Sequence, residues 1–194
     1  MKFLTATAIA ALTATAAIAD PIAYEFDKSH TEISASWMHQ GLSRQSLQLT
    51  DYDGTLLLDF DNPSNSTVDI TFNLVDGIWV GAHHDRFIAH LNSDDIFNTA
   101  EFPTAHLGAT GFDTEDGVTG MMTGDLTIIG VTVPVSLDVT LNRLRDDGTA
   151  GFTATGTITR TDWGQTIGIY AGAVSDEVII TINTELEVVE STED

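Results

Sequence analysis

The chain has 194 residues, which is enough for one domain with a buried core, and it carries a formal net charge of −22. So acidic a protein is repelled by nucleic acid and by an anionic membrane surface, which argues against both as partners. It contains no cysteine, so it must fold without disulfides.

The first segment of the chain predicts export. Residues 1–19 combine Lys2, a short run rich in alanine and threonine, and Ala17-Ile18-Ala19 directly before Asp20. This is the layout of a cleaved secretory signal peptide. We expect residues 1–19 to be removed, residues 20–194 to form one domain, and the mature protein to reside in the bacterial periplasm.

Alternation of apolar and polar residues then predicts about eight strands. The segments that alternate are 30–39, 46–60, 67–74, 104–112, 118–129, 131–141, 150–160 and 178–188. Turn signals such as "DTEDG" and "RDDGT" separate most of them. The apolar residues of 46–60 change phase, which predicts a bulge or bend near Asp53-Gly54.

Residues 75–103 interrupt this rhythm. Ser93 followed by Asp94-Asp95 resembles a helix start, and the apolar residues around Ile88 have rough helical spacing. We therefore expect a short helical segment at about residues 80–98.

Eight antiparallel strands in sequential order favour an all-β fold, a closed up-and-down barrel. Its apolar face lines the interior or, in an inside-out barrel, faces lipid. Gly120, Gly124 and Gly156 would make a poor lipid-facing surface, and the opposite face is rich in threonine and aspartate. The first arrangement is therefore favoured, without stable membrane insertion.

Strand order also predicts where the barrel opens. Odd-numbered strands end at the same end of a meander, so the segments 75–103 and 161–177 should roof one mouth. His39 and Arg160 continue the inward-facing parity there and predict a polar collar, which would bind an amphiphile tail-first. Small inward residues, namely Gly120, Gly124, Ala154 and Gly156, predict an unfilled interior.

An alternative function is a metal-dependent enzyme. His83, His84 and His90 lie close together in the roofing segment, and histidine is a common zinc ligand. Their spacing matches no established metal-binding motif, and adjacent histidines point in different directions. We therefore expect no metal site and no catalysis.

Several segments together resemble the YceI-like polyisoprenoid-binding family of secreted bacterial proteins. They are "YEFDKSHTEI" at 24–33, His39-x-Gly41-x-Ser43, "HLNSDDIFNTAEFPT" at 90–104, "GDLTIIGVTVPVSL" at 124–137, "RTDWG" at 160–164 and "DEV" at 176–178. The resemblance implies an extended, lipocalin-like eight-stranded barrel that holds a long isoprenoid lipid and has no catalytic activity or other cofactor. Phe87-Ile88 stand where family members often carry an Arg-Asp pair, which puts the family's head-group preference in doubt.

The ligand expected from these patterns is a polyisoprenoid or similar long-chain lipid of quinone or prenyl-phosphate type. A neutral head such as a quinone is favoured because the protein is so acidic. The predicted ligand-binding residues are Ile33, Ala35, Trp37, His39, Ile70, Phe72, Trp79, Phe87, Met122, Leu126, Val133, Val135, Phe152, Ala154, Ile158, Arg160 and Trp163.

Overall fold

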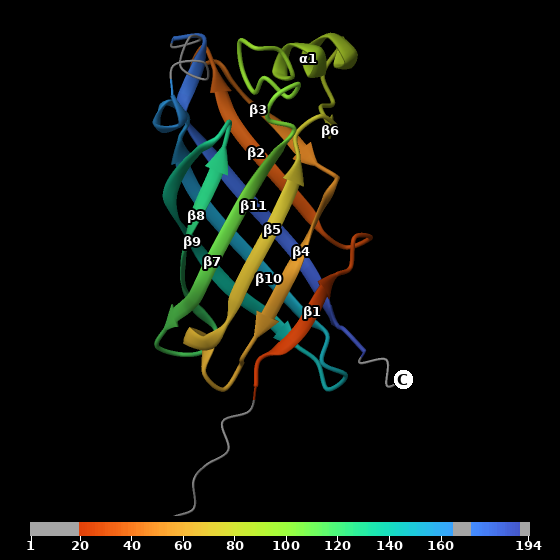
Figure 1. Ribbon diagram of the computed structural model, residues 1–194, viewed down its shortest axis with the longest axis vertical. Coiled ribbons are helices and arrows are strands. Elements are labelled where there is room, and N and C mark those ends of the chain that lie inside the picture. Colours follow the sequence, from red (N-terminus) through yellow and green to blue (C-terminus); the bar gives the residue numbers. More distant parts are fainter. Residues whose placement is uncertain (1–19, 165–171, 191–194) are drawn as a thin grey trace, which may run out of the picture.

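The computed structural model describes residues 20–164 and 172–190; the predicted signal peptide lies outside them. Within these residues, the chain forms one antiparallel sheet with a single α-helix at one end (Figure 1). Its elements are β1 (Ile22–Phe26), β2 (Glu32–His39), β3 (Ser43–Leu49), β4 (Tyr52–Leu58), η1 (Pro63–Asn65), β5 (Thr67–Asn73), β6 (Gly77–Ile78), α1 (His84–Leu91), β7 (Thr104–Thr114), β8 (Thr119–Ile128), β9 (Val131–Leu144), β10 (Ala150–Thr159), η2 (Arg160–Trp163) and β11 (Val174–Val188).

The sheet closes into the predicted eight-stranded barrel because two of its walls are each made of two strands. β11 pairs with β2 near its start and with β1 near its end, so β1 and β2 are successive parts of one wall. β3 pairs with β2 and β4 pairs with β1, which makes β3 and β4 the next wall. The prediction of a closed, up-and-down, lipocalin-like barrel is confirmed.

The predicted strands differ from the structure in the two walls that consist of two strands each. β1 was not predicted, and the phase change in 46–60 occurs at Thr50-Asp51, between β3 and β4, rather than near Asp53-Gly54. Gly54 lies inside β4 and does not mark a bend. A Cβ there would lie 2.1 Å from the carbonyl oxygen of Asp69 on β5, so the close approach of the two strands requires glycine.

The helix is shorter than predicted and lies earlier than its proposed start signal. α1 ends at Leu91, so the expectation that a helix begins at Ser93 is wrong. The Ser93 hydroxyl instead donates a hydrogen bond of 2.7 Å to the carbonyl oxygen of His90, in the last turn of α1. A hydroxyl residue satisfies free backbone groups at either end of a helix, and here it serves the C-terminal end.

The roofed end is the one that strand order predicted. α1 and its flanking segments lie beyond the ends of β2, β5 and β10, as Figure 1 shows. Part of the second predicted roofing segment, residues 165–171, lies outside the described residues. Within the described part of the chain, no helix is long and apolar enough to cross a membrane.

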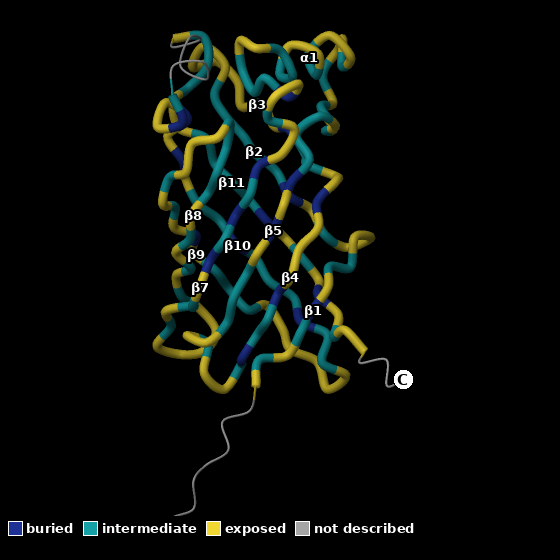
Figure 2. Tube along the Cα trace, in the orientation of Figure 1, coloured by how far each residue is buried: buried dark blue, intermediate teal, exposed yellow. Residues whose placement is uncertain are grey.

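The apolar parity points into the barrel, and the end opposite α1 is filled by side chains. Buried positions lie along the strands, where exposed positions also occur, and the turns are mostly exposed (Figure 2). Tyr24, Leu56, Ala150 and Leu186 form a buried cluster against which Phe26, Phe60 and Phe152 pack. We call this end of the barrel the closed end.

The expectation that small inward residues leave the interior unfilled is wrong at the predicted positions. A Cβ at Gly156 would lie 2.5 Å from Cδ2 of Leu137, and one at Gly124 would lie 2.7 Å from Cβ of Ala109. Ala154 is buried in the main core. These small residues accommodate close neighbours, because interiors pack densely and a large side chain on one strand needs a small one beside it.

Candidate ligand-binding cavity

A cavity of about 590 Å³ occupies the roofed part of the barrel. Every described wall of that part contributes to it, together with α1 and η2. Its aliphatic lining includes Leu47, Leu74, Leu107, Leu126 and Ile180, side chains from five different strands or strand ends. The volume lies within the range of roughly 300–1,000 Å³ that small-molecule sites occupy.

Most of the predicted ligand-binding residues line this cavity. They are Ile33, Ala35, Trp37, His39, Phe72, Trp79, Phe87, Leu126, Val135, Ile158, Arg160 and Trp163. The strand residues among them share the inward parity, whereas Phe87 comes from α1, and Arg160 and Trp163 come from η2. That they contact a ligand stays a prediction.

The structure places the other five predicted residues elsewhere. Ile70, Met122 and Ala154 belong to the main core or pack against it, below the cavity. Phe152 packs into the cluster at the closed end. Val133 is at the roofed end but packs against the cluster of Ile158 and Trp163. Parity assigned their direction correctly, but it carries no information about depth along the barrel.

Sequence reasoning missed several lining residues. Gln45, Leu47 and Leu49 come from β3, whose irregular pattern concealed its register. His90, Leu91, Ile96 and Phe97 come from α1 and the turns that follow it. The strand residues shared the inward parity and were within reach of prediction, whereas the turns after α1 have no periodic signal.

Three aromatic rings fasten the roof to the barrel wall. Phe87 of α1 lies between Trp79, with ring centroids 4.2 Å apart, and Trp37 of β2, with centroids 6.1 Å apart. Both pairs are stacked with nearly parallel planes, at 26° and 11°. All three rings line the cavity, so Phe87 connects the roof to the wall of the barrel.

Arg160 begins η2 at the end of β10, and it is buried, with 7% of its surface exposed. Its Nε donates to the carbonyl oxygen of Ser175 at 2.9 Å, and an Nη atom donates to that of Val174 at 3.2 Å. The guanidinium therefore holds the start of β11 against η2 while it lines the cavity. A side chain that fixes backbone carbonyls has a structural role whether or not a ligand is bound.

His39 completes the predicted collar in position. It ends β2, where it pairs with Val174, the residue that also accepts a hydrogen bond from Arg160. His39 is exposed and lines the cavity, as do Gln45 and His90. Apart from Ser34 near the start of β2, the polar side chains of the lining lie toward the roofed end of a mostly apolar cavity, which suits an amphiphile with its head near α1.

The roof histidines do not form a metal-binding group. Nδ1 of His84 lies 2.9 Å from the carbonyl oxygen of Trp79, and His83 is exposed. Among the described residues, none of His83, His84 and His90 belongs to a group of three or more side chains whose ligand atoms all lie within 4.8 Å of one another. Nothing in this geometry supports the metal-dependent enzyme.

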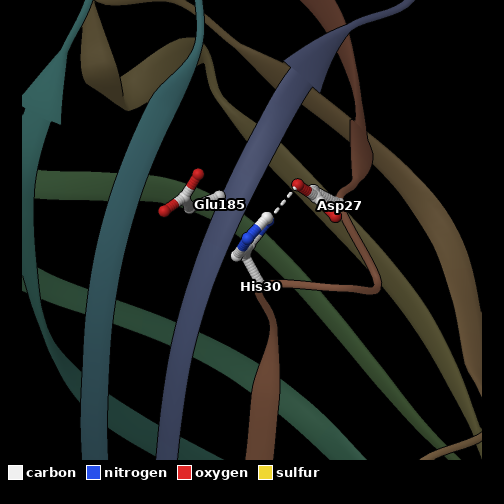
Figure 3. Close-up of side chains that lie close together, drawn as sticks. All are labelled: Asp27, His30 and Glu185. Atoms are coloured by element: carbon white, nitrogen blue, oxygen red, sulfur yellow. Dashed lines mark hydrogen bonds and ion pairs between the residues drawn. The ribbon is translucent and has the colours of Figure 1, made fainter.

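A different group of potential ligands lies on the outer surface of the barrel. Asp27, His30 and Glu185 bring one ligand atom each within 4.8 Å of the others (Figure 3). His30 Nδ1 and Asp27 Oδ2 are 2.6 Å apart, and this hydrogen bond raises the pKa of His30 and lowers that of Asp27. Asp27 Oδ1 also accepts the backbone N–H of Ser29. These contacts stabilise the turn between β1 and β2. The hydrogen bond between Asp27 and His30 therefore has a structural role in this turn.

Comparison with known proteins places the chain in a family. The YceI-like domain model matches residues 24–186. Protein YceI of Escherichia coli is 35% identical over 168 residues, which cover 84% of this chain and 85% of that protein. A UPF0312 protein of Pectobacterium atrosepticum is 35% identical over 165 residues, covering 82% and 84%.

Solved structures share the fold at lower sequence identity. BcnA of Burkholderia cenocepacia superposes with a TM-score of 0.74 at 18% identity, covering 82% of this chain and 98% of that one. A polyisoprenoid binding domain from Saccharophagus degradans, implicated in plant cell wall breakdown, has a TM-score of 0.63 at 13% identity, covering 87% and 99%. The family model and the sequence relatives together show that this chain belongs to the YceI-like family.

Proposed function

We propose that the protein binds a polyisoprenoid lipid, with the tail in the cavity and the head at the collar. The observation that carries this proposal is the closed barrel whose apolar cavity has most of its polar side chains at one end. Burial of an apolar tail contributes about 0.8 kcal/mol per methylene, so the cavity alone supplies useful affinity. The polyisoprenoid binding domain that shares this fold supports the same ligand class.

The proposed head is neutral, such as a quinone. Arg160 is the cation of the described lining, and its guanidinium donates to the carbonyl oxygens of Val174 and Ser175. The net charge of −22 also disfavours a phosphate or pyrophosphate. Stacked rings beside the collar, those of Trp37, Phe87 and Trp79, offer flat surfaces to a ring-shaped head.

The proposed activity is binding rather than catalysis. The described cavity lining contains no aspartate or glutamate, so it offers no pair of carboxylates for acid–base chemistry. The proposed place of action is the periplasm, on the basis of the export signal in residues 1–19. Cell fractionation of the native host tests the location, and N-terminal sequencing that finds Asp20 first tests the cleavage.

The ligand is tested directly. Mass spectrometry of an organic extract of protein purified from its native host should reveal an isoprenoid lipid. A purified quinone, a prenol of the same tail and its phosphate are then titrated into delipidated protein. All three tryptophans of the chain line the cavity, so their fluorescence reports occupancy. Absence of binding by all three compounds would refute the function, and preference for the phosphate would refute the neutral head.

A further inference from the structure

The cavity ends part of the way down the barrel, at a well-defined level. Moving away from α1, the last lining residues on their strands are Ile33, Leu49, Phe72, Leu107, Leu126, Leu137, Ile158 and Ile182. The next inward residues belong to a filled interior: Ile70 follows Phe72, Tyr52 follows Leu49, and Gly156 follows Ile158. The hollow and filled parts therefore meet at a floor.

Tyr52 and Ile70 stand directly below this floor. Tyr52 is 3% exposed and Ile70 is 5% exposed, and both belong to the same buried cluster as the lining residues Ile33 and Phe72. Phe26 meets Tyr52 edge to face, with ring centroids 5.2 Å apart. Further rings continue toward the closed end, where Phe60 stacks on Phe152 at 6.3 Å. We call Phe26, Tyr52 and Ile70 the plug.

We propose that the plug sets the longest isoprenoid tail that this protein accepts, and that Tyr52 and Ile70 are specificity-determining residues. This inference rests on the proposed function, since it concerns the same cavity. With the head at the collar, the tail runs toward the plug and must stop there, because the interior beyond is packed by side chains from every wall. The ligand is therefore a polyisoprenoid whose tail ends at the plug and does not extend through the whole barrel.

The physical consequence is a limit in affinity against tail length. Each isoprene unit that becomes buried raises affinity roughly tenfold or more, because several carbons leave water together. A unit that cannot pass the plug stays in water at the mouth, or pushes the head out of the collar. Affinity should therefore rise with length, reach a limit, and then level off or fall.

The experiment is a titration of the mature protein with linear polyprenols of increasing length, from geraniol through farnesol and geranylgeraniol to longer chains, followed by tryptophan fluorescence. The parent should show the limit. Tyr52→Ala removes the ring below the floor, and it should tighten binding of the first over-long polyprenol roughly tenfold. Ile70→Ala should do the same by several-fold, and it keeps the test open if Tyr52→Ala does not fold.

Phe152→Ala is the matched control. It also removes an aromatic ring from the interior, but that ring is only partly buried and packs at the closed end, away from the cavity, so the length limit should not move. A parent whose affinity keeps rising to the longest polyprenol overturns the plug, as does a limit that moves equally in Phe152→Ala. Failure of every polyprenol to bind refutes the proposed function itself, and the inference with it.

Discussion

The roofed part and the closed part of this barrel follow the same alternation of inward apolar residues, yet one is hollow and the other is filled. In the closed part, Phe26 of β1 packs on Tyr52 of β4, Phe152 of β10 stacks on Phe60, and glycine and alanine on neighbouring strands make room for large side chains. In the roofed part, the inward aliphatic residues border the cavity, and the ring of Phe87 stacks on those of Trp37 and Trp79. An inward parity therefore identifies an interior face, but it does not tell whether that face borders a core or a cavity.

The largest effect is expected when a phenylalanine is introduced into each of the two parts. Gly156→Phe should abolish the native fold or lower the free energy of unfolding by more than about 3 kcal/mol, because its Cβ alone would meet Leu137 and the carbonyl oxygen of Ser136, 2.7 Å away. Ala35→Phe faces the cavity and should fold with a loss of less than about 1.5 kcal/mol, while weakening lipid binding. Thermal and urea unfolding give the stabilities. Equal stability losses would show that the two parts are packed alike.

The second test concerns the buried cation of the roofed part. Arg160→Met removes the donors to Val174 and Ser175 and should lower the free energy of unfolding by about 1–3 kcal/mol. If the guanidinium also meets a lipid head, affinity should fall by about ten- to a hundred-fold. Arg143→Met, an exposed arginine near the closed end, should change neither quantity. Unchanged affinity in folded Arg160→Met protein would restrict Arg160 to the structural role.

A third test weakens the packing of α1 on the barrel wall and leaves the core unchanged. Phe87→Ala removes both stacked pairs, each of which contributes about 0.5–1.5 kcal/mol beyond area burial. We expect lipid dissociation to accelerate by about tenfold, measured by stopped-flow displacement. Ile88→Ala on the same helix does not line the cavity and serves as the control. A similar acceleration in both variants would assign the effect to the helix as a whole rather than to the stack.

The smallest expected effect is a pH dependence at the break between β1 and β2. The raised pKa of His30 makes its contribution to stability fully present below the unfolded value of about 6.5 and lost as pH rises through the folded value. The lowered pKa of Asp27 makes its contribution present above about 3.9 and lost as pH falls through the folded value. The pair therefore contributes most between these limits.

His30→Gln should flatten the urea-midpoint profile at both edges of this window. The effect should be small because the His30 side chain is 64% exposed and the Asp27 side chain is still partly open to solvent. His106→Gln, which removes another exposed histidine–aspartate pair from the outer surface, is the comparison variant. A profile unchanged by His30→Gln would show that the turn holds without the pair.

The amino-acid sequence determined the walls and the orientation of this barrel. Alternation such as that of 131–141 has a local cause, because successive strand side chains point to opposite faces. It predicted the inward residues of β9 from Val133 to Leu141, whereas Val131 is 39% exposed. Strand order predicted which end α1 roofs, and thus brought His39 and Arg160 to one mouth. Signals within a few residues were enough for these conclusions.

Only the tertiary structure decided where the barrel is broken and where it is hollow. β1 was not predicted because Ile22–Phe26 is short and is stabilised by pairing with the distant β4 and β11. Whether Gly156 borders space depends on Leu137, and whether a tail can pass depends on Tyr52 and Ile70, residues on other strands. Volume inside a barrel is a sum over side chains that meet only after the walls have closed, so no local pattern in the sequence encodes it.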